Sequence, residues 1–245
     1  DLPNFYRRNN IRFQSSRVAF GRPLLSGRVR TVGYKIGVIA DDFTGASDAA
    51  SFLVKRGYPT ALFTGPKESL LLECDCLVVA LKIRSVEPQQ ALAQVAAVLD
   101  FFEKAGVEKI YYKYCSTFDS TPRGNIGVVS DYLLEYADQQ YTLLCPSLPI
   151  NGRTVRDGVL YVNGVALSES PMKSHPLNPM WDSSIASLMV SQSKYPCHTL
   201  AIQELEDGVY QDRIALWARK SPHFYLIPDY VTDEDGEVIG KHFSD

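Results

Sequence analysis

Two adjacent carboxylates, Asp41 and Asp42, follow a short apolar run and directly precede a Phe-Thr-Gly-Ala sequence that can begin a helix. The free N–H groups and the dipole at a helix start attract anions. Asp41, Asp42, Thr44 and Gly45 could therefore hold a small polar molecule, with a hydroxyl group on a carboxylate and an acidic group at the helix start. Helix capping by Asp42 or Thr44 is the simpler explanation, but capping requires only one of these residues.

Cationic side chains follow two other apolar runs. Arg84 and Ser85 come after the run that begins at Cys76. An arginine can hold a carboxylate through two parallel hydrogen bonds, although a solvated surface arginine is the alternative. Lys113 precedes a loop rich in hydroxyl groups, and such a density of polar groups is costly to bury without a ligand or full pairing. The candidate binding residues of this loop are Lys113, Ser116, Asp119, Ser120, Gly124 and Asn125.

Two later polar segments add Arg153 and His175 as candidates for ligand contact. A single histidine is more often a structural hydrogen-bonding residue, and the spacing of His and Cys indicates no metal site. The chain lacks the G-x-x-x-x-G-K-[ST], G-x-G-x-x-G and G-x-S-x-G motifs, so nothing indicates a site for a nucleoside triphosphate. The strand–Asp-x-Asp-x-Thr signature of haloacid dehalogenase phosphatases also fails, because Ala40 stands where the nucleophilic Asp is required.

The elements that would position these residues alternate between strands and helices. This alternation, with apolar strands, predicts an α/β fold with a mostly parallel, doubly wound sheet and helices on both faces. In such sheets, ligands bind beyond the carboxyl ends of the strands, which is where the candidates lie. An inserted β-hairpin is expected around Asn163-Gly164. Strands are expected at 35–40, 60–63, 76–83, 109–114, 141–145, 199–203 and 224–231, and helices at 44–56, 87–104, 125–137, 182–192 and 209–220.

The 245 residues carry a formal charge of −3, which divides into +6 over residues 1–34 and −9 over residues 35–245. The basic leader is expected to lie outside the fold, as a targeting peptide, a vector leader or upstream translation. The acidic remainder argues against nucleic-acid binding. Its apolar runs are too short to cross a membrane. Five cysteines without a C-x-x-C pair favour reduced thiols and a cytoplasmic location.

Taken together, five ordered motifs resemble the amino-terminal domain of the four-carbon acid sugar kinases. The form of residues 115–121, Cys-Ser-Thr-Phe-Asp-Ser-Thr, is most similar to the 3-oxo-tetronate 4-kinase branch, with the D-threonate and D-erythronate kinases as the alternative. Arg123, before Gly124, and the Leu-Pro-Ile sequence at 148–150 depart from the family's usual pattern. The motifs are Ile39–Ala46, Ala80–Ser85, Lys113–Thr121 with 124–127, Asn151–Val155 and His175–Met180.

This resemblance implies ATP-dependent phosphorylation of the terminal hydroxyl of a four-carbon sugar acid. Residues 35–235 would bind the acid, and 236–245 would be a linker or the start of a missing ATP-binding domain. ATP and Mg²⁺ would serve the full-length enzyme, with neither expected on this chain alone. A homodimer is possible. Asp42 and then Asp119 are the candidate catalytic carboxylates. The implied substrate-binding residues are Asp41, Thr44, Gly45, Arg84, Ser85, Lys113, Ser116, Ser120, Gly124, Asn125, Arg153 and His175.

Two hypotheses from other classes remain open at this point. The chain could be a non-catalytic binding module for small sugar acids. It could also be a metal-dependent lyase or isomerase that uses Asp41 and Asp42. Chelation would abolish the activity of such a lyase in the absence of ATP, whereas a binding module would have no activity to lose.

Overall fold

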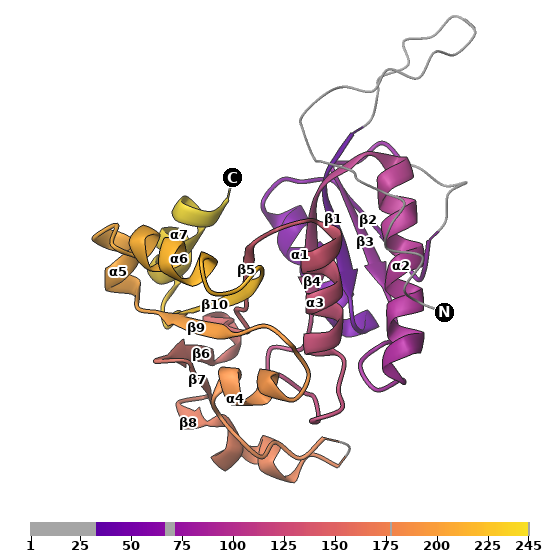
Figure 1. Cartoon of the computed structure of the whole chain (residues 1–245). Helices are drawn as coiled ribbons and strands as arrows, with labels where there is room; N and C mark the ends of the chain where they lie inside the picture. Colours follow the sequence, from indigo (N-terminus) through magenta and orange to yellow (C-terminus); the bar gives the residue numbers. More distant parts are fainter. Residues whose placement is uncertain (1–32, 67–71, 177, 245) are drawn as a thin grey trace, which may run out of the picture.

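The computed structural model describes residues 33–66, 72–176 and 178–244, which fold as an α/β protein with the expected alternation of strands and helices (Figure 1). Most of the basic leader, whose predicted extent is 1–34, lies outside the described residues. The described part divides its parallel strands between two sheets and adds a small antiparallel sheet. Among the helices described, none has both the length and the apolar character needed to cross a bilayer.

The first sheet is parallel and has the strand order β2-β3-β1-β4. All five residues of β3 are buried, as expected for a strand that has helices on both faces. The register places Ala40, the last residue of β1, beside Ala80 of β3 and Lys113 of β4. The strands are β1 (Tyr34–Ala40), β2 (Thr60–Phe63), β3 (Cys76–Ala80) and β4 (Val107–Lys113).

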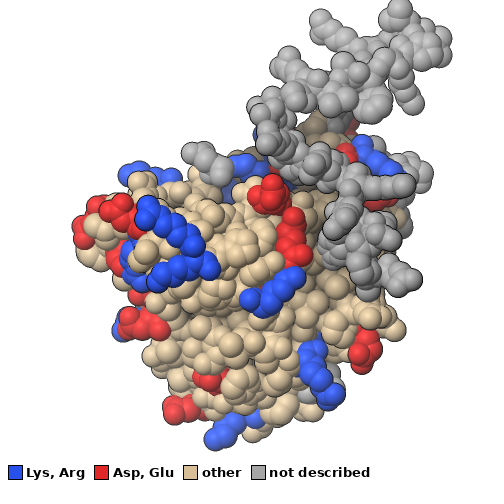
Figure 2. Space-filling view, viewed as in Figure 1, with Lys and Arg blue, Asp and Glu red and all other residues tan. Residues whose placement is uncertain are grey.

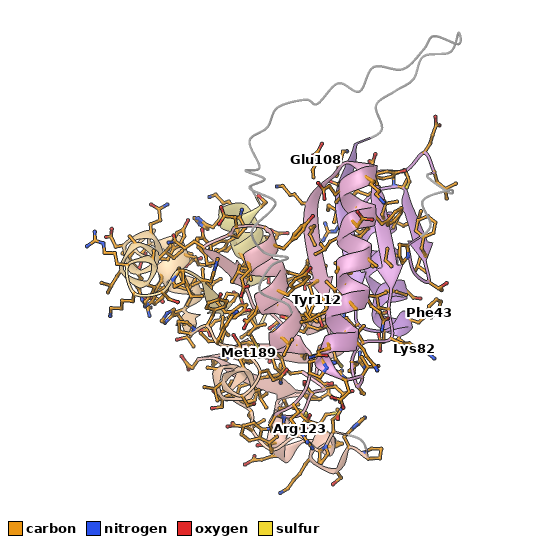
Figure 3. The ribbon with its side chains drawn as sticks, turned by 45° about the vertical axis from the view of Figure 1, so that its right-hand side comes forward. Phe43, Lys82, Glu108, Tyr112, Arg123 and Met189 are labelled. Carbon is orange, nitrogen blue, oxygen red and sulfur yellow. The ribbon has the colours of Figure 1, made fainter. Side chains whose placement is uncertain are left out.

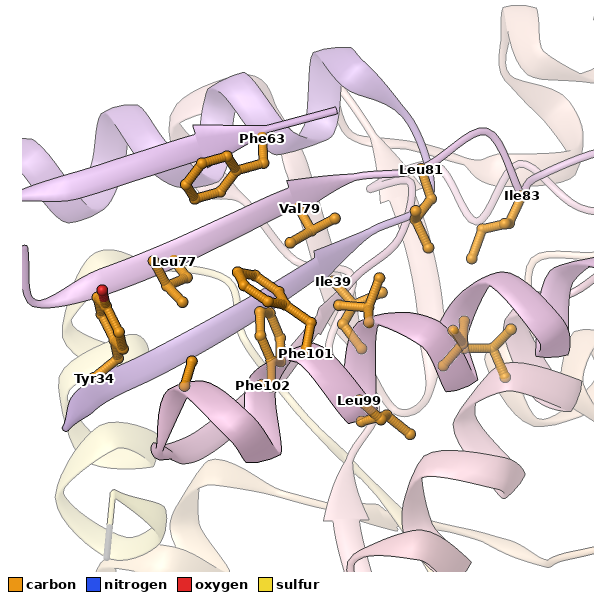
Figure 4. Packing of buried hydrophobic residues seen from close by; sticks show 14 of the residues in the cluster. Tyr34, Ile39, Phe63, Leu77, Val79, Leu81, Ile83, Leu99, Phe101 and Phe102 are labelled. Carbon is orange, nitrogen blue, oxygen red and sulfur yellow. The ribbon is translucent and has the colours of Figure 1, made fainter. Parts of the chain in front are cut away.

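Three helices cover this sheet. Helix α1 (Phe43–Lys55) packs on one face, where its Ala46 is buried against Val38 and Val78. Helix α2 (Pro88–Ala105) packs on the other face through apolar side chains that include Phe101 and Phe102 (Figure 4). Helix α3 (Ile126–Tyr136) lies beside α2 and contributes side chains to two separate hydrophobic clusters.

Local sequence explains where these helices begin and end. Asp42 accepts a hydrogen bond from the Gly45 amide at 2.6 Å and thereby caps α1. Pro88 occupies the first turn of α2, where its missing N–H has no cost. Gly106 ends α2 with a φ of 73°, in the left-handed region that glycine adopts readily.

The second parallel sheet has the order β5-β10-β9 and is covered by the C-terminal helices. Its strands are β5 (Tyr141–Leu143), β9 (Cys197–Leu200) and β10 (Phe224–Pro228). The helices of this half are α4 (Ile185–Val190), α5 (Ile202–Glu206), α6 (Tyr210–Ala218) and α7 (Asp233–Phe243). Ile239 of α7 is buried among the side chains that cover this sheet, so the predicted domain boundary at 235 falls inside a packed helix.

The expected β-hairpin around Asn163 and Gly164 is present, and both residues have a positive φ, of 51° and 80°. It is part of a larger unit that the sequence did not predict, because β6 (Arg153–Arg156) pairs with β7 (Val159–Val162), which pairs in turn with β8 (Val165–Ala166). Three short 3₁₀ helices complete this region, at Pro149–Asn151, Leu167–Glu169 and Pro171–Ser174.

The expected ends of four strands and the expected single sheet need correction. The strands expected at 141–145, 199–203 and 224–231 end at Leu143, Leu200 and Pro228. The strand expected at 76–83 ends at Ala80, and residues 81–83 continue as a loop towards Arg84. The expected single sheet is two sheets, because β4 and β5, the edge strands of the two sheets, are not hydrogen-bonded to each other. The apolar patterns that predict strands carry no information about which strands pair.

Candidate functional site

The carboxyl ends of β1, β3 and β4 lie side by side, because these three strands are adjacent and parallel. The loops that follow them carry Asp41 and Asp42, Arg84, and Asp119. Figure 3 shows Phe43, which directly follows Asp42, and Lys82 of the loop after β3 at one end of the sheet, and Glu108 near the start of β4 at the other end. The topology therefore brings these three loops together, as expected for loops that follow neighbouring parallel strands.

Arg84 is the centre of this site and forms ion pairs with three aspartates. Its Nε lies 2.9 Å from Asp41 Oδ2, and its Nη2 lies 3.0 Å from Asp41 Oδ1. The same Nη2 lies 2.7 Å from Asp42 Oδ2, and Nη1 lies 3.4 Å from Asp119 Oδ2. The planar guanidinium can make such contacts in several directions at once. One cation thus joins carboxylates from two other loops.

Asp41 is the most deeply buried member of this cluster, with an exposure of 1%. Burial raises the pKa of its carboxyl above the ordinary value, and the ion pair with Arg84 only partly opposes this effect. Arg84 itself has a raised pKa, because its hydrogen bonds to Asp41 and the neighbouring negative charges outweigh its own desolvation. The ion pair with Arg84 therefore counteracts burial, which by itself would disfavour the charged form of the Asp41 carboxyl.

Asp42 has two roles that use its two oxygen atoms separately. Oδ1 accepts from the Gly45 amide and caps α1, while Oδ2 pairs with Arg84. The side chain remains 30% exposed, in contrast to the buried Asp41 and Asp119. Of the three carboxylates paired with Arg84, Asp42 is therefore the most accessible to a bound molecule.

Asp119 lies on a third loop and is fixed by a residue far away in the sequence. Its Oδ1 accepts a hydrogen bond of 2.7 Å from Asn178 Nδ2, and Asn178 is itself buried. The backbone N–H of Asn178 donates to His175 Nδ1 at 3.1 Å, so in the neutral imidazole the proton lies on Nε2. His175 Nδ1 is 3.9 Å from Asp119 Oδ1. The predicted His175 is thus adjacent to the cluster, and Asn178 is a member that the sequence reasoning did not select.

Lys113 ends β4 beside the start of α1. Its Nζ donates to the Tyr114 carbonyl at 2.7 Å, and its positive charge opposes part of the rise in the pKa of Asp41. A Cβ placed on Gly45 would be 3.4 Å from Lys113 Nζ and 2.9 Å from Asp42 Oδ1. Gly45 therefore allows the lysine, the helix start and the Asp42 carboxylate to approach one another closely.

The loop after β4 depends on close packing around Ser120. Ser120 Oγ donates to Gln192 Oε1 at 3.2 Å, and the Gly127 amide donates to the same oxygen. A Cβ on Gly124 would lie 1.8 Å from Ser120 Oγ, so a larger residue at position 124 would displace the hydroxyl. Ser120 and Gly124 are brought to the site region, but here they hold the loop together. No short-range sequence signal points to Gln192.

Asn125 connects two of the site's loops. Its Nδ2 donates to the Ile83 carbonyl at 2.6 Å and to the Val86 carbonyl at 2.7 Å, on either side of Arg84. Its Oδ1 is buried and has no hydrogen-bond partner among the described residues. The described contacts of Asn125 therefore orient the backbone that carries Arg84.

Phe118 shapes the same loop from the apolar side. Its φ is 49°, an unusual value for a residue other than glycine, and its side chain is fully buried. The ring packs edge-on against Tyr114, with the ring centroids 5.9 Å apart. Burial of this ring stabilises the strained turn that directs Asp119 towards Arg84.

The other predicted residues are placed differently. Thr44, in the first turn of α1, and Ser85, next to Arg84, are exposed, and Ser116 is half-buried. Arg153 lies on β6, where its Nη1 donates to the Asn151 carbonyl. Within the described parts of the chain, no hydrogen bond or ion pair links Arg153 to the Arg84 cluster.

The side chains around Arg84 do not form a metal site. Across residues 33–66, 72–176 and 178–244, no group of three or more His, Cys, Asp and Glu side chains could hold a metal ion. Arg84 occupies the position between Asp41, Asp42 and Asp119 that a cation would take. On the face shown in Figure 2, basic and acidic side chains are interspersed.

A cavity of about 380 Å³ lies next to the cluster, beyond the carboxyl ends of β2 and β3. Phe43 and Lys82 line it, and these residues neighbour Asp42 and Arg84 in the sequence. The cavity is mostly apolar, and Lys82 supplies its charged side chain. The polar cluster and this cavity therefore share the loops that follow β1 and β3.

Comparison with known proteins identifies relatives along most of the chain. The family described as the sugar-binding N-terminal domain matches residues 36–244. A Brucella melitensis protein named 3-oxo-tetronate kinase is 43% identical over 212 residues, and one of the same name from Escherichia coli K12 is 43% identical over 213 residues. Each match covers 86% of this chain, but 49% and 55% of the respective relative. The chain thus spans about half the length of these relatives.

Solved structures agree with the fold. A Salmonella typhimurium LT2 crystal structure matches with a TM-score of 0.81 and 41% identity, over 86% of this chain and 51% of that one. A Bordetella bronchiseptica protein with bound citrate, described as a domain-swapped dimer, matches with a TM-score of 0.67 and 28% identity. That match covers 84% of this chain and 50% of the Bordetella chain.

Proposed function

Because the chain belongs to the family of sugar-binding N-terminal domains, we propose that it is the substrate-binding half of a sugar-acid kinase. The full-length enzyme would use ATP to phosphorylate the 4-hydroxyl of a four-carbon acid sugar such as a 3-oxo-tetronate. The names of the Brucella and Escherichia coli relatives support this assignment. Citrate in the Bordetella structure supports a site that accepts a small carboxylic acid.

The observation that carries the proposal is the Arg84 cluster. Three carboxylates from two loops are held together by one guanidinium, and Lys113 lies beside them. Carboxylates are strong hydrogen-bond acceptors and suit the hydroxyl groups of a sugar acid. A site that pairs with hydroxyl groups discriminates strongly against analogues that lack them.

The carboxylate of the substrate requires a cation, and the contacts of Arg84 make it a poor choice. Arg84 already pairs with three aspartates, which differs from the free clamp that its position in the sequence suggests. We assign the acid group instead to Lys113 and the start of α1, where free N–H groups attract anions. Thr44 is exposed at this helix start and can add a hydroxyl contact.

Phosphoryl transfer needs positioning and charge stabilisation more than covalent chemistry. Within this chain, Asp42 is the best candidate to accept the proton of the attacking hydroxyl, since it is the accessible carboxylate of the cluster. Asp119 is the second candidate, but its two oxygens are held by Asn178 and Arg84. Asp41, which is almost fully buried, would orient Arg84 and Asp42.

ATP and Mg²⁺ would be held by the part of the full-length relatives that this chain does not match. The lack of a cluster of metal-ligating side chains among the described residues supports this placement of Mg²⁺. We also propose that the chain can form homodimers, as the Bordetella relative does, and that it works in the cytoplasm. The five free cysteines are consistent with that location.

Calorimetric titration with erythronate, threonate and their 3-oxo forms tests the binding role. We expect one of these acids to bind, and Lys113→Ala to weaken its affinity at least about tenfold, which corresponds to about 1.4 kcal/mol. Lys220→Ala is the matched control, because this exposed lysine lies beyond α6, in the half of the chain that forms the second sheet. Unchanged affinity in Lys113→Ala would overturn the assignment of the acid group.

A kinase assay tests the catalytic role separately. In a protein that joins this chain to the second half of the Escherichia coli relative, Asp42→Asn should retain acid binding and lose most of the turnover. Phosphate transfer from ATP by this chain without a second half would contradict the proposed division of labour. Binding of an acid with no turnover in any joined protein would favour a non-catalytic module.

A further inference from the structure

A crevice separates the two parallel sheets. It holds a cavity of about 260 Å³ whose walls are the edge strands β4 and β5 and whose floor is α3. Consecutive residues of both strands line it, so the strands face it with their backbones as well as their side chains. Tyr111 and Tyr112 of β4, Thr142 and Leu143 of β5, and Leu133 and Leu134 of α3 are among the lining residues.

Both walls of the crevice are edge strands. Strand β4 pairs only with β1, and β5 pairs only with β10, in the part of the chain that the structure describes. An edge strand presents a row of unpaired N–H and C=O groups that can receive another strand. Tyr111 on β4 is also 52% exposed, although it lies on a parallel strand of the kind that is normally covered.

The end of α7 lies at the mouth of this crevice. The Phe243 ring packs edge-on against Tyr141, the first residue of β5, with the centroids 6.4 Å apart. Lys109, near the start of β4, donates a hydrogen bond to the Ser244 carbonyl. These contacts place residues 243 and 244 between the starts of the two edge strands, as the position of the C-terminus in Figure 1 also shows.

We propose that this crevice is the slot for one parallel β-strand, supplied by the polypeptide that follows α7 in the full-length relatives. The matched family is described as an N-terminal domain, and those relatives are about twice as long as the matched region, so polypeptide is expected to follow it. A chain that continues from residue 244 enters the crevice where β4 and β5 both begin, and would therefore run parallel to both. The inserted strand would join the two sheets into one.

The connection fits the rules of parallel sheets. Strand β10, helix α7 and the inserted strand form a β-α-β unit, the usual way to link parallel strands. A strand inserted between β4 and β5 would lie about 4.8 Å from each of them, the usual spacing of hydrogen-bonded strands. The face towards α3 is apolar, with Leu133, Leu134 and Ala137, so the inserted strand should place apolar side chains there.

The proposal is tested with an extended protein, in which the segment that follows the matched region of the Brucella relative is fused to the C-terminus of this chain. Amide hydrogen exchange is then measured on β4 and β5. We expect the amides around Tyr111 and Thr142 to exchange at least about tenfold more slowly than without the extension, and the melting temperature to rise. The matched control carries prolines at alternate positions of the added segment, which removes its ladder donors.

A peptide of the same segment, titrated against the unextended chain, provides a second arm that does not depend on folding of the extended protein. Equal exchange rates with the natural and the proline-substituted segments, in both arms, would overturn the proposal. Slow exchange that grows with protein concentration without any added segment would assign the crevice to a second copy of the chain, and would also overturn it. Neither result depends on whether the chain binds a sugar acid, so failure here is distinct from failure of the proposed function.

Discussion

Arg84 and Asp41 form a two-point ion pair across 43 residues of sequence, with Nε and Nη2 of the guanidinium on the two oxygens of one carboxylate. Asp41 is 1% exposed, so this pair lies at the inner end of the cluster. Asp42 and Asp119 contact the outer side of the same guanidinium at 2.7 and 3.4 Å. The geometry of the whole site therefore depends on Arg84.

Replacement of Arg84 by methionine should strongly destabilise the protein. It would leave the carboxylates of Asp41 and Asp119 buried without their cation, and breaking a buried pair in this way costs about 3–5 kcal/mol. We expect a loss near the lower limit, since Arg84 is 22% exposed. Chemical denaturation measures it. Lys82→Met is the control, because Lys82 is two residues away and exposed, and it should change the free energy of unfolding little. Equal stability of the two variants would show that the ion pairs of Arg84 do not stabilise the site.

The buried Asp41 carboxyl should make stability depend on pH in a specific direction. Its pKa is raised in the folded state by burial, so the folded protein binds this proton more tightly than the unfolded chain. The contribution of Asp41 to stability is therefore greatest below the unfolded pKa of about 3.9 and declines as pH rises through the folded pKa. Asp41→Asn removes this decline.

We expect the difference in melting temperature between Asp41→Asn and the unmodified chain to grow, in favour of the variant, as pH rises from about 4 towards neutrality. Thermal unfolding over this pH range measures the difference. Asp48→Asn, on an exposed position of α1, controls for the general effect of removing a charge. Parallel curves for Asp41→Asn and the unmodified chain would contradict the expected shift. Binding of the sugar acid should nonetheless weaken in Asp41→Asn. The amide has one acceptor oxygen, so it cannot accept hydrogen bonds from both Arg84 nitrogens through two oxygens as the carboxylate does.

Gln192 should be a positioning residue for the loop that carries Asp119. Its Oε1 accepts from both Ser120 Oγ and the Gly127 amide, and its side chain is buried. Gln192→Ala leaves two donors without an acceptor, which costs about 1–3 kcal/mol for a buried group. We also expect weaker acid binding, measured by calorimetry below the unfolding temperature. Gln203→Ala is the control, because the exposed Gln203 side chain donates to the exposed Asp207 carboxylate.

A conservative variant separates a positioning role from simple loss of packing. Gln192→Glu keeps an acceptor oxygen for Ser120 and Gly127, so it should recover more of the acid affinity than Gln192→Ala does. If both variants bind the acid as tightly as the unmodified chain while both are less stable, Gln192 stabilises the fold without positioning the site.

The proximity of the candidate site's loops could be predicted from the sequence, but the pairing of side chains within them could not. Asp41, Asp42, Arg84 and Asp119 follow strands whose carboxyl ends meet, and a strand–helix alternation is enough to expect this. The role of Arg84 was different from expectation, because a pairing between three loops depends on tertiary distances. Asn178 and Gln192 were not selected for the same reason, since they reach Asp119 and Ser120 across 59 and 72 residues.

The fold shows the same division between local and long-range information. Asn163 and Gly164 predict a tight turn from their own backbone preferences, and the turn is present. The pairing of β6 with β7 and the separation of β4 from β5 have no local signal. The pattern of apolar residues predicts where strands lie in the sequence. Which strands pair in a sheet depends on tertiary contacts that this pattern does not contain.

Three glycine-to-alanine substitutions should separate close approach from helix propensity. A Cβ on Gly127 would lie 2.6 Å from Gln192 Cβ and 2.8 Å from its backbone carbon, and neither atom can move freely. Gly127→Ala should therefore destabilise the protein by about 1–3 kcal/mol through overpacking. Gly240, in α7, has open space around the same position, so Gly240→Ala should stabilise the protein by up to about 1 kcal/mol.

Gly124→Ala is the informative intermediate case, because its added methyl would meet Ser120 Oγ at 1.8 Å. Removing that hydroxyl in Gly124→Ala/Ser120→Ala leaves contacts of 3.0 and 3.1 Å with Thr121 O and Ser120 Cβ, which small shifts can relieve. The double variant should thus be more stable than Gly124→Ala alone, as a double-mutant cycle of unfolding free energies would measure. Gly127→Ala cannot be rescued by Ser120→Ala, because its clash involves Gln192; equal rescue of both glycine variants would show that displacement of the Ser120 hydroxyl is not the cause.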